Sequence, residues 1–350
     1  MSETTPLSPQ HVAFILIPRF SMMSLAGTTE VMRAANEASE RQLYEWHYFS
    51  PDGRRVLASN GVRMDIEGHC DAAADFKTVI VCGGHYSHAY DDRELSLALR
   101  KADRNGADIG GLDTGAHALA RANLLDGYRA TIHWDNMAAF AENYPSIQVT
   151  PGLYQVDRNR FTCGGGTAAI DLMLHLVTLK HGAQLATTVS EQLLIERIRS
   201  FDDMQRRGAA TLRGVRHPKL MRVIEMMEQN LETPLQRSHM AGVVELSPRQ
   251  LERLFNKYMG CTPAKYYIEL RLRRARLLLL QTGMSIIDVA LACGFVSASH
   301  FSKCYKDFFG HTPRRERDMA PLVWTNTDAQ LKPFTTAQGV TVGRLSQVRE

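Results

Sequence analysis

The chain has 350 residues, of which 44% are hydrophobic, enough for about two or three domains with cores of their own. No stretch approaches the roughly 18 apolar residues that span a membrane, and the start, MSETTPLSPQ, lacks the basic and apolar regions of a secretory signal. We therefore expect a cytoplasmic protein with no membrane partner. Residues 213–320 carry 18 Lys and Arg against 10 Asp and Glu, whereas the rest carries 23 against 27. This basic part predicts a polyanionic partner.

The first two hundred residues alternate short apolar runs with helical patterns. They predict strands at 11–17, 44–49, 78–82 and 108–112, and helices at 25–38 and 91–104. This alternation is typical of a mainly parallel sheet that helices cover on both faces. Ligands bind such sheets at the carboxyl ends of the strands. The turns of interest are therefore Gly83–Gly84, Asp113–Thr114–Gly115, and His133–Trp134 after RATIHW.

The turn that follows the strand at 108–112 has the order strand, sharp turn, small residue, helix. That order describes a nucleophile elbow, in which a strained turn presents one side chain to a pocket above the sheet. Here the presented side chain is that of Asp113. A simpler alternative is that Asp113 only caps the helix that follows it.

Five segments of this region carry a family resemblance. They are AGTTEVMRAAN with Glu30, VCGG with Gly83 and Gly84, GGLDTGAHALARANLLDG with Asp113, RATIHW with His133, and RFTCGGGTAAIDLMLHL with Thr167 and Asp171. With them the chain resembles the class I glutamine amidotransferase-like domains of the PfpI type, which are fused to AraC-type domains in the GlxA group of regulators. The resemblance covers nearly all of residues 10–198 and implies a flavodoxin-like, amidotransferase-like α/β sandwich.

The chain departs from that superfamily at the elbow. Its enzymes place an activated cysteine there, whereas this chain has Asp113. Carboxylates are nucleophiles in some hydrolases, but nothing in the sequence supplies the rest of such a mechanism. We therefore predict a sensor pocket with no catalytic residue. The alternative is a hydrolase or lyase of that superfamily whose turnover depends on Asp113 or on a displaced thiol such as Cys82 or Cys163.

A carboxylate in a partly desolvated pocket predicts a cationic ligand group, because an unpaired buried charge is costly. Aromatic faces suit an ammonium group, and backbone N–H groups suit a ligand carboxylate. A small zwitterion fits both, and the resemblance implies an amine or amino acid such as glycine betaine, carnitine, sarcosine, dimethylglycine or arginine. The candidate ligand-binding residues are Asp113, Glu30, His133, Trp134, Gly83, Gly84, His85, Thr114 and Thr167. Alternatively, Glu30 and His133 are structural and pair with each other or with Asp113.

Neither a metal ion nor a cofactor is expected. The six cysteines are scattered without a Cys-x-x-Cys pair, which argues against a disulfide framework and against a zinc site. The segment HYSH places His85 and His88 close together, but no carboxylate accompanies them. Buried thiols are the simplest interpretation of the cysteines.

Changes in composition predict the domain boundaries. A sensing domain at 10–198 ends with two helices within 167–198, and residues 199–216 are polar, basic and glycine-containing, as in a linker. A second domain follows at 217–320. Residues 321–350 show little periodicity and predict a flexible tail.

The second domain contains one pattern twice, in SPRQLERLFNKYMGCTP from Ser247 and in SASHFSKCYKDFFGHTP from Ser297. Each copy has an apolar trio at i, i+3 and i+4, which shares one helical face, and then Gly and Thr-Pro, which stop the helix and start the next. Ala241 and Ala290 precede the two copies, each followed by a turn. Helix, short turn and second helix form a helix-turn-helix unit, with recognition helices predicted at 248–258 and 298–308.

The outward faces of these two helices carry side chains that pair with base edges and phosphates. They are Arg249, Gln250, Glu252, Arg253 and Asn256 in the first helix, and Ser299, His300, Ser302, Lys303 and Lys306 in the second. Any amphipathic helix shows charges to solvent, but the duplication favours DNA contact. One helix predicted at 266–281 joins the units, and insertion of both on one face of the duplex requires roughly 34 to 36 Å between them.

The stretch from about Leu220 to Arg317 closely resembles the AraC/XylS family DNA-binding domain, in both units and in the helix between them. Only LQRSHMAGVVELS, the first helix of the first unit, is less typical, which leaves its ends open. The resemblance implies regulation of transcription, usually activation, with promoter DNA and RNA polymerase as partners and a homodimer as the working form.

Three hypotheses follow from the sequence. The first is a ligand-responsive activator of catabolic genes, in which the sensing domain binds a small amine or amino acid and changes how the second domain engages DNA. The second is the hydrolase or lyase fused to a DNA-binding domain. The third is a regulator that needs no effector and has a purely structural first domain. Whether the unliganded form is off DNA, or bound and inactive, stays open.

Overall fold

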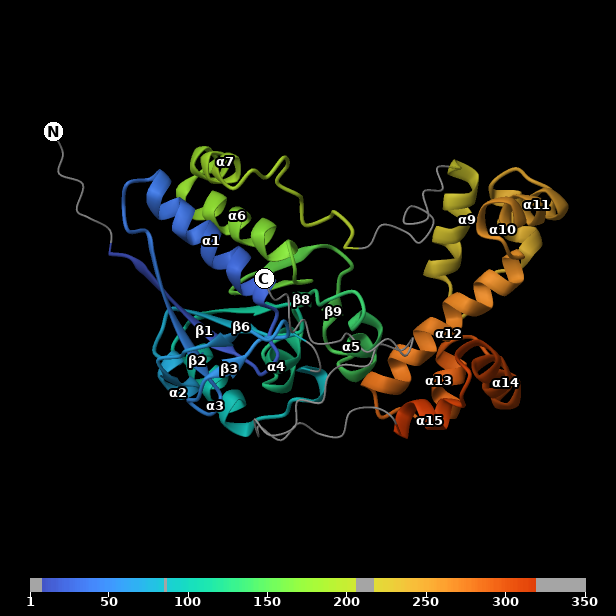
Figure 1. Ribbon diagram of the computed structural model, residues 1–350, viewed down its shortest axis with the longest axis horizontal. Coiled ribbons are helices and arrows are strands. Elements are labelled where there is room, and N and C mark those ends of the chain that lie inside the picture. Colours follow the sequence, from blue (N-terminus) through green and yellow to red (C-terminus); the bar gives the residue numbers. More distant parts are fainter. Residues whose placement is uncertain (1–7, 85–86, 206–216, 319–350) are drawn as a thin grey trace, which may run out of the picture. The chain divides into compact units, whose positions relative to one another are not determined.

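The computed structural model describes residues 8–84, 87–205 and 217–318 (Figure 1). The predicted tail at 321–350, residues 206–216 of the predicted linker, and His85 lie outside these residues. Among the helices within them, none is long and apolar enough to cross a membrane.

A seven-stranded sheet forms the centre of the N-terminal part, in the order β10-β11-β7-β6-β1-β2-β5. Its neighbouring strands run parallel except for β10 and β11. Two further strand pairs, β3–β4 and β8–β9, form separate small sheets. The strands are β1 (Gln10–Leu16), β2 (Tyr44–Ser50), β3 (Val56–Leu57), β4 (Arg63–Met64), β5 (Gly68–His69), β6 (Thr78–Cys82), β7 (Asp108–Leu112), β8 (Arg129–Ala130), β9 (Gln148–Val149), β10 (Tyr154–Asp157) and β11 (Arg160–Cys163).

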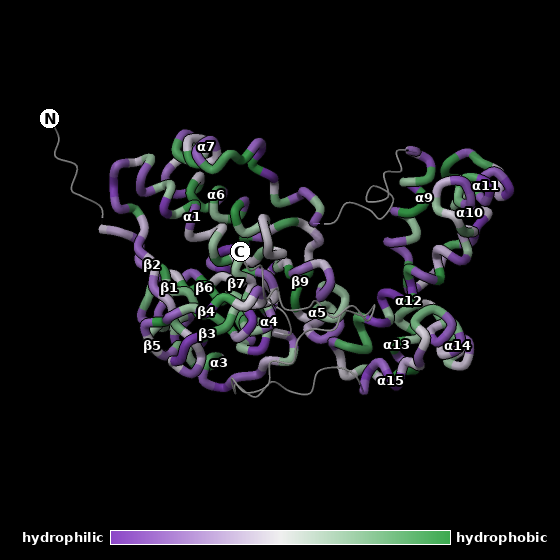
Figure 2. The backbone as a smooth tube through the Cα atoms, in the orientation of Figure 1, coloured by the Kyte–Doolittle hydropathy of each residue, from purple (hydrophilic) through white to green (hydrophobic). Residues whose placement is uncertain are grey.

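Helices cover both faces of this sheet, as the alternation predicted (Figure 1). Side chains alternate along a strand, so Phe14 and Leu16 of β1 enter one core, and Ala13 and Ile15 enter the other. Figure 2 shows hydrophobic residues concentrated on the central strands, and every residue of β6 is buried, as a strand covered on both faces requires. The helices are α1 (Met22–Ala38), α6 (Ala168–His181) and α7 (Ala183–Gln192) over one face, and α2 (Cys70–Ala73), η1 (Ser87–Ala89), α3 (Arg93–Arg104), α4 (Ala116–Arg121) and α5 (Met137–Asn143) elsewhere.

One strand was placed wrongly from the sequence. The segment RATIHW was expected to be a strand of the parallel sheet, with the turn at His133–Trp134 leaving its carboxyl end, but β8 covers only Arg129–Ala130 and pairs with β9 instead. The strand that completes the carboxyl edge beside β7 is β11, which runs into Gly164. Short strands carry too little periodicity to reveal which sheet they join.

The C-terminal part is helical and contains the two predicted units. Its helices are α9 (Pro218–Gln229), α10 (Arg237–Val243), α11 (Pro248–Met259), α12 (Pro263–Gln281), α13 (Ile286–Ala292), α14 (Ala298–Phe309) and α15 (Pro313–Asp318). The predicted recognition helices correspond to α11 and α14, and the predicted joining helix corresponds to α12. The atypical segment of the first unit contains α10, a helix of only seven residues.

The two units share their stop and start signals in detail. Ser247 caps α11 and Ser297 caps α14, each through its side chain. Each helix ends at a glycine with positive φ, Gly260 at 69° and Gly310 at 79°. The turn between the helices of each unit also needs positive φ, which the second unit supplies with Gly294 and the first with Glu245.

The long helix α12 is attached to the second unit by its arginines. Arg271 lies over the Phe295 ring at 4.0 Å and donates to the carbonyl of Cys293 at 2.6 Å. Arg276 donates from Nε to the buried carboxylate of Glu316 at 3.0 Å. Part of the positive charge that predicted a polyanionic partner therefore holds the domain together.

Candidate functional site

The elbow turn is strained, as predicted. Asp113 has φ of 60° between β7 and α4, a region that costs a residue with a side chain about 1 to 2 kcal/mol. Close backbone contact leaves no room around this turn, because a Cβ on Gly83 would lie 2.3 Å from the Gly115 nitrogen. A Cβ on Gly115 would lie 2.2 Å from the Val81 carbonyl oxygen. The glycines thus allow the turn to lie directly on the neighbouring strand.

The carboxylate of Asp113 lies in a partly buried site. Burial raises its pKa to about 7, although hydrogen bonds from the Ser21 hydroxyl and the Thr114 backbone N–H oppose the rise. Gly165 faces this carboxylate, since a Cβ on that residue would lie 2.5 Å from Oδ2 of Asp113. Ser21 also caps α1, and no motif in the sequence identified it as a member of the site.

The two cysteines nearest the elbow are poor nucleophiles. Cys82 and Cys163 are fully buried, and burial raises the pKa of both thiols, that of Cys163 to about 12. The N–H of Asp113 and that of Gly165 lower the pKa of Cys163 without offsetting the effect of burial. Neither thiol is a thiolate near neutral pH, which weakens the hydrolase alternative.

Backbone N–H groups from Gly83 to His85 and near Thr167 were expected to suit a ligand carboxylate, and those of Gly83 and Gly84 already have partners in the protein. The N–H of Gly83 donates to the Leu112 carbonyl at 3.1 Å, and that of Gly84 donates to the Ser87 hydroxyl at 3.0 Å. The Thr114 hydroxyl likewise donates to the Gly84 carbonyl at 2.6 Å. These three residues hold the elbow turn against the neighbouring loop, so the two glycine N–H groups are not open to a ligand carboxylate.

Thr167 lies at the start of α6 and belongs to a cluster centred on Asp171. The carboxylate of Asp171 is buried and accepts from Arg199 Nε at 3.0 Å and Nη2 at 2.5 Å. The same Nη2 donates to the Thr167 hydroxyl at 2.7 Å. Thr167 therefore contacts the residues that follow the sensing domain, a role that its position in a helix cap did not predict.

His133 and Trp134 lie beside a residue that the sequence analysis placed in the linker. Their rings are 5.5 Å apart, and the backbone N–H of Trp134 donates to Oε1 of Gln205 at 2.9 Å. Nε2 of Gln205 donates to the Thr131 hydroxyl and to two carbonyls, all at 2.8 to 3.0 Å. A Cβ on Gly164 would lie 2.3 Å from this carboxamide. Gly164 and Gly165 thus separate Gln205 from Asp113.

Glu30 stands apart from these residues. It is exposed on α1, and its carboxylate pairs with Arg33 at 2.8 Å. The alternative that it pairs with His133 or Asp113 is therefore wrong, because an arginine three residues away on the same helix provides a closer partner.

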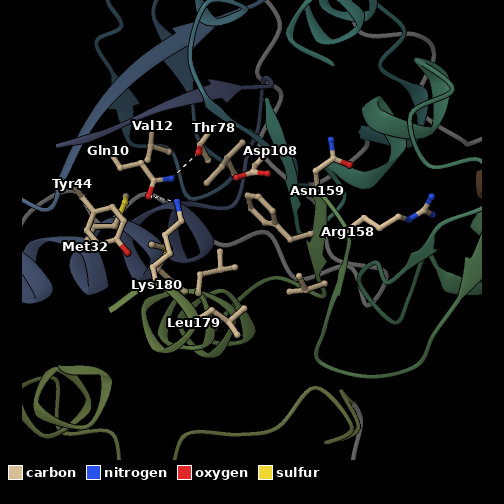
Figure 3. A pocket seen from close by; sticks show the side chains of 15 residues that line it. Gln10, Val12, Met32, Tyr44, Thr78, Asp108, Arg158, Asn159, Leu179 and Lys180 are labelled. Carbon is tan, nitrogen blue, oxygen red and sulfur yellow. Dashed lines mark hydrogen bonds between the residues drawn. The ribbon is translucent and has the colours of Figure 1, made fainter. Parts of the chain in front are cut away.

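A cavity of about 190 Å³ lies at the opposite edge of the sheet, near the amino ends of β1 and β6 (Figure 3). Its polar side chains bind one another, since Lys180 donates to Gln10 at 2.6 Å and Gln10 donates to Thr78 at 2.7 Å. Burial lowers the pKa of Lys180. This cavity is separate from the elbow, which follows the carboxyl end of β7.

The candidate DNA-contacting residues are divided by the structure into two groups. Some already bind protein: Gln250 closes the capping box of α11, Glu252 pairs with Arg237 at 3.0 Å, and His300 contacts Cys304 at 3.3 Å. Ser302 is half-buried. The exposed remainder offers mainly cations and amides, in Arg249, Arg253, Asn256, Ser299, Lys303 and Lys306.

Known proteins match both parts of the chain. Residues 10–179 match the DJ-1/PfpI family, and residues 240–319 match a helix-turn-helix domain. The HTH-type transcriptional regulator GbdR of Pseudomonas aeruginosa is 47% identical over 90% of this chain and 86% of its own. GlxA of Rhizobium meliloti, another such regulator, is 38% identical over 87% and 94%. The crystal structure of an AraC family transcriptional regulator from Pseudomonas putida is 33% identical, with a TM-score of 0.50, over 53% of this chain and 100% of that one.

The parallel α/β fold with its elbow and the duplicated helix-turn-helix define a two-part DNA-binding regulator. The chain belongs to the family of HTH-type transcriptional regulators that join a DJ-1/PfpI domain to an AraC-type helix-turn-helix domain.

Replacing Asp113 with Asn should make stability less dependent on pH. The folded-state pKa of about 7 lies above the ordinary value of 3.8, so the wild type loses stability as pH rises from about 4 through 7. Between pH 5 and pH 8 the variant should gain on the order of 1 to 3 kcal/mol relative to the wild type, after allowance for solvent screening. Urea unfolding of the full-length chain at both pH values measures this difference. Asp91→Asn, at an exposed position, is the control, and an equal response of the two variants would contradict the assignment.

Proposed function

We propose that the chain is a ligand-responsive transcriptional activator whose N-terminal domain senses a small amine or amino acid without catalysis. Asp113 is the observation that carries this proposal. Because burial raises the pKa of Asp113, ionisation of this side chain without a partner destabilises the folded protein. A ligand cation that pairs with the carboxylate would remove this cost. Gly165 lies against this carboxylate and Gly164 lies against the Gln205 carboxamide. The backbone N–H of Trp134 donates to Gln205, and the Trp134 ring is the proposed aromatic face for an ammonium group.

The absence of catalysis is proposed on chemical grounds. The elbow presents a carboxylate that is half-protonated near pH 7, and the two buried thiols close to it, Cys82 and Cys163, are protonated. The proposed domains are a sensing domain at 10–198, a linker at 199–216 and a DNA-binding domain at 217–320. In this proposal the sensing domain binds its ligand and does not convert it. Turnover of amides or aldehydes that is lost in Asp113→Asn would overturn this proposal.

Glycine betaine, carnitine, sarcosine, dimethylglycine and arginine are the proposed ligand class, and a thermal-shift panel of these compounds tests it. A ligand present at about 100-fold its dissociation constant should add roughly 3 kcal/mol to the stability of the full-length chain. Binding should strengthen from pH 6 to pH 8, because a cation pairs with the ionised form of Asp113. Asp113→Asn should abolish both effects, while Asp91→Asn should keep them. Ligands that bind with no dependence on Asp113 would refute the proposed site.

The proposed DNA contacts lie on the exposed faces of α11 and α14. Arg253 is exposed on α11, and its guanidinium suits a bidentate pair with guanine. Arg253→Ala should weaken binding to the specific promoter by roughly 1 to 3 kcal/mol and relax preference at one base. Arg222→Ala removes an exposed arginine of α9 that pairs with Glu225, and should change little. Fluorescence anisotropy with specific and random duplexes measures the difference, and equal losses on both would reject base reading.

We propose that ligand binding in the first domain is coupled to DNA binding in the second through residues 199–205, which we call the strap. Arg199 fixes its start to Asp171, and the Leu153 N–H donates to the Asp203 carbonyl at 3.0 Å along β10. At its end the Gln205 carboxamide lies against Gly164, next to the glycine that faces Asp113. A ligand that displaces these glycines would loosen Gln205, and the strap continues directly into residues 206–216, the rest of the proposed linker.

Replacing Gln205 with Ala should therefore uncouple ligand from DNA. The variant should retain ligand binding through Asp113, but its DNA binding or its activation of a promoter should respond to ligand several-fold less than that of the wild type. Gln192→Ala on α7 is the matched control, since that glutamine is exposed and pairs with Glu37 at 2.8 Å. Ligand titrations and promoter-reporter assays measure the two effects separately. A normal ligand response in Gln205→Ala would show that coupling uses another path.

A further inference from the structure

Two histidines and a glutamate meet at the amino ends of β1 and β2, far from the elbow in the sheet. His11 is the register partner of Glu45, and His47 lies two residues further along β2. Because side chains alternate between the faces of a sheet, all three project from the same face. His11 lies more than thirty residues before Glu45 and His47 in the chain, so no local spacing reveals the three as a set.

The distances among their ligand atoms are those of a metal site. His11 Nδ1 lies 3.5 Å from His47 Nε2 and 3.8 Å from a carboxylate oxygen of Glu45, and His47 Nε2 lies 3.7 Å from the other oxygen. All three atoms fall within 4.8 Å of one another. A tetrahedral zinc ion with bonds of about 2.0 to 2.1 Å holds its ligand atoms roughly 3.3 to 3.4 Å apart. Closing the site around such an ion requires movements of only a few tenths of an ångström.

We propose that His11, Glu45 and His47 form a binding site for a divalent transition-metal ion of the zinc class, with water in the remaining position. Imidazole and carboxylate together suit zinc and its neighbours better than magnesium or calcium, which prefer oxygen ligands alone. The side chains of His11 and Glu45 are 51% and 41% exposed, so an ion and its water reach the site directly from solvent.

A further carboxylate orients one of the ligands. Glu67 Oε2 lies 2.8 Å from Nδ1 of His47, and its other oxygen accepts from the Tyr48 N–H at 3.2 Å. The proton of His47 is thereby held on Nδ1, which leaves the lone pair of Nε2 directed at the site. The ring also packs against Phe76 at 5.1 Å. With that tautomer of His47, the proton of the 3.5 Å contact between the two rings belongs to Nδ1 of His11, and metal binding would move it to Nε2 of the same ring.

Zinc titration of the full-length chain, stripped of metal with a chelator, tests the proposal. Calorimetry in competition with a chromophoric zinc chelator should show one equivalent of bound Zn²⁺, which is lost in His47→Ala. Glu67→Gln should weaken binding by about 10- to 100-fold while the three ligands remain. His69→Ala, which removes a histidine that pairs with Glu94 in the same domain, should bind as the wild type does.

The site would be refuted if a variant with both His11→Gln and His47→Ala took up the same equivalent with the same affinity. It would also be refuted if the wild type bound no zinc. If His47→Ala does not fold, His11→Gln decides the question, because that ring is half exposed. Substitution with Co²⁺ gives an independent signal, since a four-coordinate ion produces visible absorption that should vanish in His11→Gln. Ligand sensing at Asp113 does not enter either measurement.

Discussion

The close backbone contact at the elbow is the constraint on which the N-terminal half depends. Asp113 holds a left-handed backbone conformation because Gly83 and Gly115 allow its turn to lie directly on β6. Any side chain at either glycine would push the turn away from the sheet. The same contact places the carboxylate where burial opposes its charge, so the geometry that strains the backbone also favours the protonated carboxyl group.

In the DNA-binding half, the corresponding constraint is a buried polar cluster that holds helices of the domain together. The buried carboxylate of Glu316 joins the second unit to α12 by accepting from Arg276, from the Tyr305 hydroxyl at 2.9 Å, and from His311 at 2.5 Å. Burial tends to raise the pKa of Glu316, but these partners together lower it. A buried carboxylate with three donors is specific in geometry, and its loss would leave several polar groups unpaired.

The two halves differ in how far apart in the sequence their structure-determining residues lie. Each helix-turn-helix unit is specified by signals within about twenty residues: a serine cap, an apolar trio, a glycine with positive φ, and Thr-Pro. The surroundings of the elbow instead gather Ser21, Asp113, Gly165 and Gln205 from four separate parts of the chain. Only the first set repeats as a readable pattern. Gln205 in particular lies in a polar segment that looks like plain linker.

The sequence by itself determined the parallel α/β class, the elbow at Asp113, the two recognition helices and the helix between them, because periodicity and capping signals act over short distances. Only the tertiary structure decided that β8 pairs with β9 outside the main sheet and that Glu30 pairs with Arg33. It also decided that the N–H groups of Gly83 and Gly84 donate to other residues of the protein. It also decided the use of charge, since Arg271 and Arg276 bind groups of the protein itself. Strand register brought His11 beside Glu45 and His47. Register and side-chain partners depend on residues far apart in the chain, whose distances no local pattern contains.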